Sequence, residues 1–474
     1  MPGSESSARA AVLAQPRPRV PRRVATSRWH AFLGVCVALT LALAACTPGG
    51  ATPSPTPTPT PMQPWKLRLS DPKADYFSTL ALARDDTIFT VRYSGEVGHL
   101  VKSFAPDGAP GWETLLKGGF AVPRDIKVAP DGTIVLAGWT EPEEHAGDAR
   151  YHNAYLAKLS PQGEVLWEKS LGGPEQDEFN GVAVSADGSI TAVGFTCSTT
   201  GDFPAPPIAH APDPELCEAA LAVSFSPDGD QRWAKIYGGS FSSMFGQADA
   251  APDGSIVTNG QNLSDDGDLP VWPGLNDDGT VTPIEFVTKL TPDGSIVWST
   301  PVDQKSGGRL HDVVVDPAGA ILAAGRKNNK AEVMKLSADG AIVWTVSVDG
   351  VVDSTMNTFP REIALTADGG AVAVGQGAPP GGGATFRGLV MRVTSDGRLA
   401  WVKLYGTAVS FHAVAETTDG AVIVAGGAET LDDFPANGPL PTTPTATVPL
   451  DPPTGRESDS VIARLSSEGE LAAD

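Results

Sequence analysis

Positive charge and cysteine are both scarce in this sequence of 474 residues. Lysine and arginine number 34 against 56 acidic residues, which leaves a formal net charge of −22, and only four residues are cysteine. A surface with this excess of negative charge repels phosphate backbones, so we expect no nucleic-acid partner. Long apolar runs are missing as well. The run at residues 31–45 has about 15 residues, which is short for a membrane-spanning helix.

Familiar catalytic and ligand-binding motifs are also missing. The chain has no Gly-x-Ser-x-Gly elbow, no glycine-rich phosphate loop and no His-Glu-x-x-His zinc motif. An Asp-x-Asp-x-Asp-Gly calcium loop is absent too, and no constellation of residues suggests a cofactor. We therefore expect a protein that is not an enzyme and that binds neither a metal nor a cofactor.

The N-terminus carries the features of an export signal. Six arginines precede the apolar run, and the run ends in Leu43-Ala44-Ala45-Cys46. This ending resembles the lipobox of bacterial lipoproteins, in which the cysteine is lipidated and becomes the first residue. The alternative is an ordinary signal peptide that leaves Cys46 free. Residues 46–63 alternate threonine and proline, a composition that stays extended as a tether. We expect a signal peptide at 1–45, a tether at 46–63 and a lipid anchor at Cys46.

The remaining cysteines agree with export from the cytoplasm. Cys36 lies in the leader, so only Cys197 and Cys217 remain in the folded part of the chain. Disulfides persist in oxidising compartments, and we expect these two to pair and to close a loop of roughly 20 residues. Two free thiols are the alternative.

A unit of four short apolar segments recurs seven times. The clearest copy spans residues 124–173, and turn residues separate its Val-, Ile- and Leu-rich segments. A marker tryptophan recurs at Trp65, Trp112, Trp167, Trp233, Trp298, Trp344 and Trp401. Asp-Gly or a close relative recurs at two turns of each copy, and this dipeptide between apolar runs is a strong hairpin signal. The repeat predicts an all-β, seven-bladed propeller of four-stranded blades over residues 64–474.

The two ends of the repeat region predict how the ring closes. The C-terminus stops before an eighth marker tryptophan, and residues 65–70 form a lone strand with no preceding three. We expect this N-terminal strand to complete the C-terminal blade, which would remove the free edge of its sheet. The marker tryptophans themselves are expected to pack between adjacent blades.

Segments such as Ala137-Gly138-Trp139-Thr140 and Ala157-Lys158-Leu159-Ser160 resemble the bacterial beta-propeller repeat of secreted and surface proteins. The Gly-x-x-x-Trp pattern, as in Gly163 to Trp167, more weakly resembles blades of pyrroloquinoline-quinone dehydrogenases and of the outer-membrane barrel-assembly lipoprotein. The first resemblance covers nearly all of the chain after the leader. It implies a fold more firmly than a function, because that family shares no catalytic residues.

Insertions and polar residues gather on one predicted face. The longest variable segments, 197–217, 261–284, 376–387 and 427–457, all connect strands on the face opposite the tight turns. The position eight residues before the first-turn glycine should ring the channel mouth at the start of each innermost strand. Its occupants are Ser78, Arg124, Asn180, Gly246, His311, Arg361 and His412. Either these are ordinary polar strand ends, or Arg124, Asn180, His311, Arg361 and His412 bind a ligand. Trp272 either caps its own loop or contacts a sugar or protein.

These features favour a non-catalytic, monomeric binding or scaffold protein of the bacterial cell envelope. It would be anchored to the outer membrane or the cell surface and would bind an envelope protein or a polysaccharide through its loop-rich face. One alternative is an envelope hydrolase or lyase that acts on an anionic saccharide at the channel mouth, and another is a structural surface protein with no small ligand.

Overall fold

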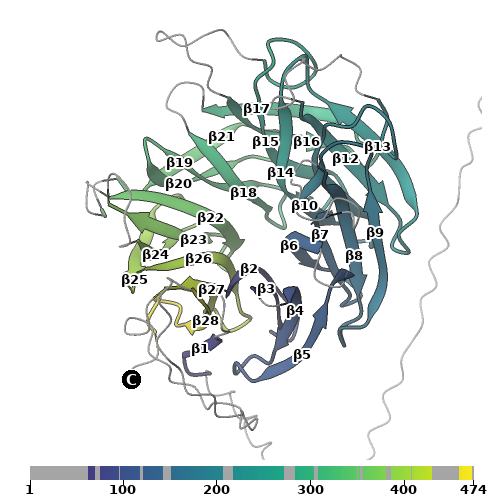
Figure 1. Cartoon of the computed structure of the whole chain (residues 1–474). Coiled ribbons are helices and arrows are strands. Elements are labelled where there is room, and N and C mark those ends of the chain that lie inside the picture. The colour runs from purple at the N-terminus through teal and green to yellow at the C-terminus, as the bar shows by residue number, and fades with distance from the viewer. Residues whose placement is uncertain are drawn as a thin grey trace, which may run out of the picture. The chain divides into compact units, whose positions relative to one another are not determined.

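Twenty-eight strands, arranged as seven four-stranded antiparallel sheets, make up the described part of this computed structural model (Figure 1). The structure describes residues 62–69, 75–95, 97–117, 121–141, 151–205, 217–271, 283–303, 308–349, 351–352, 356–379, 386–406, 408–429 and 458–471. These residues belong to one compact unit, residues 60–474. The predicted leader, Cys46, most of the tether and Trp272 lie outside the described residues.

The sheets surround a central channel, and we number them as blades in chain order, with the innermost strand first. Blade 1 contains β2 (Asp75–Leu82), β3 (Ile88–Ser94), β4 (Gly98–Phe104) and β5 (Pro110–Leu115). Blade 2 contains β6 (Ala121–Val128), β7 (Ile134–Thr140), β8 (Asn153–Leu159) and β9 (Val165–Leu171). Blade 3 contains β10 (Asp177–Val184), β11 (Ile190–Thr196), β12 (Ala219–Phe225) and β13 (Gln231–Tyr237). Blade 4 contains β14 (Ser243–Ala250), β15 (Ile256–Asn262), β16 (Ile284–Leu290) and β17 (Ile296–Asp303).

The last three blades follow the same order. Blade 5 contains β18 (Arg309–Val315), β19 (Ile321–Lys327), β20 (Lys330–Leu336) and β21 (Ile342–Ser347). Blade 6 contains β22 (Asn357–Leu365), β23 (Ala371–Ala378), β24 (Arg387–Val393) and β25 (Leu399–Tyr405). Blade 7 contains β26 (Val409–Glu416), β27 (Val422–Ala428), β28 (Asp459–Leu465) and, from the other end of the chain, β1 (Trp65–Leu69). The predicted fold, blade count and strand exchange are therefore confirmed.

Fourteen tight turns of one kind recur in the described residues: thirteen join the first to the second strand or the third to the fourth strand of a blade, and the last follows β28. In each, the first residue donates its N–H to the carbonyl four residues on, as Ala129 does to Thr133 at 2.8 Å. The fourth residue adopts a positive φ, which is +84° at Gly132. Glycine fills this position in every turn except the first, where Asp86 has φ 62°. The recurring Asp-Gly pairs thus form turns, since only glycine adopts this backbone conformation without strain.

Each marker tryptophan packs against the next blade around the ring. The partner is always the positive-φ glycine of the third-to-fourth-strand turn, as for Trp298 against Gly340. Five of the seven indole N–H groups also donate to a carbonyl of that turn, including Trp112 to Pro161 at 3.0 Å. Seven hydrophobic clusters form the core, each lying between two adjacent blades. Packing between blades therefore supplies most of the apolar burial.

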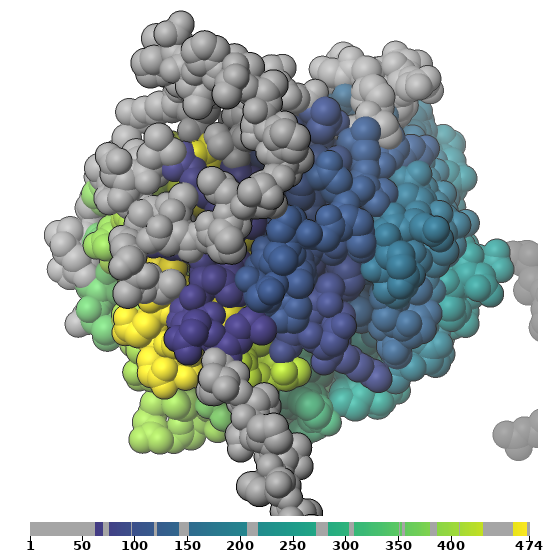
Figure 2. Space-filling model, turned by 90° about the horizontal axis from the view of Figure 1, so that it is seen from below, coloured from purple at the N-terminus to yellow at the C-terminus, as the bar shows by residue number. Residues whose placement is uncertain are grey.

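Blade 7 closes the ring through both ends of the chain. Strand β1 pairs antiparallel with β28, with Trp65 opposite Arg464, and Figure 2 shows the purple N-terminal residues against the yellow C-terminal ones. Across the seam between blades 7 and 1, buried Asp75 accepts hydrogen bonds from the backbone N–H and hydroxyl of Ser460, both at 3.1 Å. Asp75 also forms a buried ion pair with Arg92. This polar network ties the first complete blade to the composite one.

Cys197 and Cys217 form a disulfide, as expected. The strand ends that the long connections join lie on the face opposite the hairpins, and three of the predicted segments include residues that belong to strands. Residues 261–262 belong to β15, 376–378 to β23 and 427–428 to β27. No helix among the described residues has the length and apolarity needed to cross a membrane.

Candidate functional site

The innermost strand of every blade contains a β-bulge at the predicted ring position. In blade 2, Pro123 pairs with Gly138 and Asp125 with Ala137, so Arg124 has no partner across the ladder. The same irregularity occurs at Ser78, Asn180, His311, Arg361 and His412, and in blade 4 it extends over Gly246 and Gln247. A bulge redirects the side chain of the extra residue. These residues therefore lie within the strands, at bulges, and the prediction that each begins its strand was wrong.

A glycine on the second strand accompanies the bulge in six blades. A Cβ on Gly138 would collide with the carbonyl oxygen of Val122, and one on Gly325 would lie 2.5 Å from that of Arg309. The bulged backbone therefore approaches the second strand too closely for any side chain at this position. The glycine near the end of the second apolar segment, as at Gly138, is the sequence signal that accompanies the bulge.

All seven ring residues line a single cavity at the channel mouth. The cavity has a volume of about 750 Å³, and its walls also include Tyr76, His99, Glu178 and Arg309. It lies at the end of the channel that faces the long connections, because the ring residues come from the early part of each innermost strand. The structure thus brings together Arg124, Asn180, His311, Arg361 and His412, although their role in binding stays a proposal.

Arginines give the mouth a positive charge in an otherwise acidic protein. Arg124 lies 3.7 Å from the Glu178 carboxylate, which is also 2.8 Å from Nδ1 of His152. By contrast, Arg309 and Arg361 line the cavity without a hydrogen-bond or ion-pair partner among the described residues. Part of the Arg361 side chain is exposed to the cavity. Loss of water around its guanidinium nevertheless lowers the pKa of that group.

The histidines at the mouth are uncharged at neutral pH. Burial, aided by the charges of Arg309, Arg326 and Arg361, lowers the pKa of His311 to about 3. Burial and Arg361 lower the pKa of His412 to about 4, and its Nδ1 lies 2.9 Å from the Phe77 carbonyl oxygen of blade 1. His412 therefore also links blade 7 to blade 1, which is a structural role.

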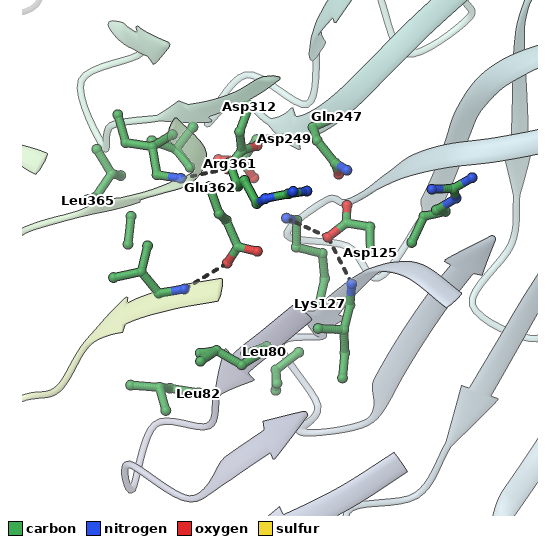
Figure 3. A pocket seen from close by; sticks show the side chains of 18 of the residues that line it. Leu80, Leu82, Asp125, Lys127, Gln247, Asp249, Asp312, Arg361, Glu362 and Leu365 are labelled. Carbon is green, nitrogen blue, oxygen red and sulfur yellow. Dashed lines mark hydrogen bonds and ion pairs between the residues drawn. The ribbon is translucent and has the colours of Figure 1, made fainter. Parts of the chain in front are cut away.

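A second cavity, of about 320 Å³, lies further along the channel and is shown in Figure 3. Its walls include Asp125, Lys127, Asp249, Asp312 and Glu362. Lys127 Nζ lies 3.1 Å from Asp125 Oδ1. Burial raises the pKa of Asp312 to about 7 and raises that of Glu362 well above its usual value. One lysine thus faces several carboxyl groups, some of which hold protons near neutral pH.

These carboxylates join adjacent blades. Asp125 accepts a hydrogen bond from the backbone N–H of Val182 in blade 3, at 2.9 Å. Asp312 accepts one from Ile363 of blade 6, also at 2.9 Å, and Glu362 accepts one from Val414 of blade 7, at 3.2 Å. The buried carboxylates therefore have a structural role, because each bonds to the backbone of another blade. Among the described residues, no group of three or more histidine, cysteine or acidic side chains is placed to hold a metal ion.

Sequence analysis missed both the inner carboxylates and Arg309. The inner carboxylates carried a signal, because charged residues interrupt strands that otherwise read as buried, as in Asp125-Ile126-Lys127-Val128. Arg309 carried none, because it lies outside the aligned ring position and reaches the mouth only through the fold.

With this geometry in place, comparison with known proteins supports the propeller assignment. Residues 285–461 match a family model described as "Outer membrane protein assembly factor BamB", a quinoprotein-like propeller repeat. This agrees with the weaker of the two resemblances read from the sequence. The match covers less than half of the chain. No curated protein matches the chain significantly.

Solved structures with similar architecture are distant in sequence. A protein of unknown function from Bacteroides caccae shares 11% identity at a TM-score of 0.39, covering 70% of this chain and 94% of that one. A second protein of unknown function, from Dyadobacter fermentans, shares 10% at 0.42, covering 73% and 94%. The Pan2 WD40 domain of Neurospora crassa shares 8% at 0.46, covering 82% and 88%. These likenesses concern the fold alone.

Proposed function

We propose that this protein is a non-catalytic binding module whose ligand enters the channel mouth on the loop-rich face. The observation that carries the proposal is the set of seven bulges, whose residues line one cavity of about 750 Å³ and, in every blade but the fourth, bring a side chain to it. Ligand sites are concave, with volumes of about 300–1,000 Å³ and a few convergent polar groups. Residues of all seven blades also line the second cavity, further along the channel, but that cavity is smaller, at about 320 Å³, and its carboxylates already bond to adjacent blades.

We further propose that the protein is exported and anchored at the cell envelope. The arginine-rich leader, the lipobox-like residues 43–46 and the Thr-Pro tether support export to a bacterial cell envelope and anchoring through Cys46. A tethered, monomeric propeller would stand off from the membrane and present its loop-rich face to an envelope protein or polysaccharide.

Capture from detergent-solubilised envelope tests the mouth directly. Three baits are compared: the wild-type chain, Ser78→Trp, which fills the mouth, and Gln162→Trp, which places the same bulk on an exposed hairpin of the other face. We expect wild type and Gln162→Trp to retain a partner that Ser78→Trp loses. Retention by all three baits would place the binding surface outside the mouth.

A second candidate is an enzyme that acts on an anionic saccharide. The observation in its favour is the pair of uncharged imidazoles, His311 and His412, beside Arg361. A neutral imidazole can accept a proton while a guanidinium holds a carboxylate, and a bound anion would raise the histidine pKa values towards neutrality. The test is the release of new reducing ends from acidic polysaccharides by wild type but not by His311→Ala. Binding without cleavage would favour the non-catalytic module.

A further inference from the structure

Arg309 and Arg361 line one side of the mouth with Arg326 beside them, and none of the three has a hydrogen-bond or ion-pair partner within the part of the chain that the structure describes. Arg309 on β18 lies directly opposite Arg326 on β19, in register across the ladder. Like charges directly opposite each other destabilise a sheet. Arg361 comes from the next blade, and the charges of all three act on His311. The protein therefore holds three positive charges around one histidine.

Several other arginines of the propeller are neutralised by carboxylates. Arg92 pairs with Asp75, Arg392 with Glu416 at 3.0 Å, and Arg464 with Asp419 at 2.5 Å. Arg309, Arg326 and Arg361 have no carboxylate or hydrogen-bond partner among the described residues, although the chain has 56 acidic residues. Arg232 and Arg387 also lack a carboxylate but donate to a hydroxyl or to backbone carbonyls, whereas the three arginines of this cluster have neither kind of partner among the described residues.

Two buried polar atoms in the cluster also lack partners. Nε2 of His311 and Nε of Arg326 are buried without a hydrogen bond in the described part of the chain. Arg326 instead lies over the ring of Phe359, 5.1 Å from its centroid. Buried polar groups in native proteins are satisfied in the great majority of cases, so two orphans beside a cavity indicate a missing partner. Glu178 and Glu362 also line the cavity, but the charges that act on His311 are those of three arginines, so an anion is the partner that fits this side of the mouth.

We propose that Arg309 and Arg361 bind an oxyanion group, carboxylate, sulfate or phosphate, borne on a small polar molecule such as an acidic sugar. Arg326, on the neighbouring strand β19, adds to the positive potential at this site. Guanidinium groups bind such anions through paired, charge-assisted hydrogen bonds. The cavity is far larger than one inorganic anion and lies in the size range of larger ligands, which favours an anionic group attached to a bigger molecule. This inference rests on the proposed function and names the ligand class of the same mouth.

Calorimetric titration of the full chain tests the proposal with three probes at constant ionic strength: sulfate, glucuronate and glucose. We expect sulfate and glucuronate to bind and glucose not to bind. Tighter binding of glucuronate would identify an anion carried on a sugar, whereas equal binding would identify the free oxyanion as sufficient. Failure of the wild-type chain to bind either anion would overturn the proposal.

Variants separate the arginines from general electrostatics. Arg309→Gln and Arg361→Gln should each weaken anion binding roughly 10- to 100-fold, the range for a charge-assisted hydrogen bond. The matched control, Arg84→Gln, removes an exposed arginine from a hairpin on the opposite face and should bind as wild type does. Removing one of several repelling charges should leave the melting temperature of the unliganded protein unchanged or higher. Unweakened binding in both cavity variants, or a lower melting temperature in them, would contradict the proposal.

The two proposals, that the mouth binds a ligand and that this ligand is an anion, can fail separately. If the anions fail to bind while Ser78→Trp still abolishes capture of an envelope partner, the mouth is a binding site for another chemistry. If neither result is obtained, both proposals are wrong.

Discussion

Substituting one turn glycine tests whether the tryptophan contacts hold the blades together. Gly340 has φ +87°, and a Cβ there would lie 2.7 Å from Cδ2 of Trp298 in the preceding blade. Gly319, in the other hairpin of the same blade, has φ +86°, but its Cβ would meet only the Ala338 Cβ, at 3.5 Å. Gly340→Ala and Gly319→Ala therefore share the backbone strain and differ in the contact with the indole.

The two variants share the cost of backbone strain, and Gly340→Ala adds two further costs to the free energy of unfolding. Alanine at a positive φ costs about 1–2 kcal/mol in both variants. In Gly340→Ala the indole must also move, which adds about 1–3 kcal/mol of overpacking. Its 3.2 Å hydrogen bond from Nε1 to the Ala338 carbonyl would weaken, adding about 1 kcal/mol. We expect a loss of about 3–6 kcal/mol for Gly340→Ala and about 1–2 kcal/mol for Gly319→Ala.

Urea unfolding followed by tryptophan fluorescence measures both losses, provided that the slope of each transition is unchanged. A double-mutant cycle with Trp298→Leu isolates the contact, because Gly340→Ala should then lose only the shared backbone term. Equal losses in the two glycine variants would show that the tryptophan contact contributes nothing and that our account of inter-blade packing is incorrect.

Four other predictions concern closure, charge and anchoring. Deleting residues 65–69 should lower the melting temperature of the whole propeller, because it exposes the edge of β28, and an unchanged value would refute closure by β1. Arg361→Gln should raise the pKa of His311 above about 3, read from the NMR titration of its ring, and no change would show that Arg361 does not act on it. Burial raises the pKa of Asp312 to about 7 from 3.8, so the folded chain retains a proton that the unfolded chain releases in this window. The free energy of unfolding should therefore fall between about pH 4 and pH 7, and Asp312→Asn should flatten that slope; an unaltered slope would count against it. Cys46→Ser should abolish incorporation of a labelled fatty acid and release the protein from the membrane fraction, whereas retained label would exclude Cys46 as the anchor.

Much of the fold could be predicted because its signals are local and repeated. An Asp-Gly turn depends on the backbone preference of one residue, and the marker tryptophan lies four residues after the turn glycine in blades such as 163–167. Seven copies of such a unit leave few architectures open. The incomplete unit at each end also indicated that the final blade is shared.

The candidate site was predictable only in part. Aligning the repeats located the seven ring positions, since every blade places the equivalent position of its repeat at the same level of the channel. The bulges were not expected, because one extra residue in a ladder depends on how two strands pair rather than on the composition of either. The ring residues lie at these bulges, in the interior of the strands, and line one cavity together.

The sequence by itself determined the repeat, the number of blades, the closure of the ring and the face that carries the long connections, because each depends on spacing along the chain. Only the tertiary structure decided which charges meet in the channel. Arg309 and Arg326 become neighbours through strand pairing, and Arg361 joins them from the next blade. Whether an arginine is neutralised or left without a partner depends on residues distant in sequence, and that property distinguishes this mouth from an ordinary polar strand end.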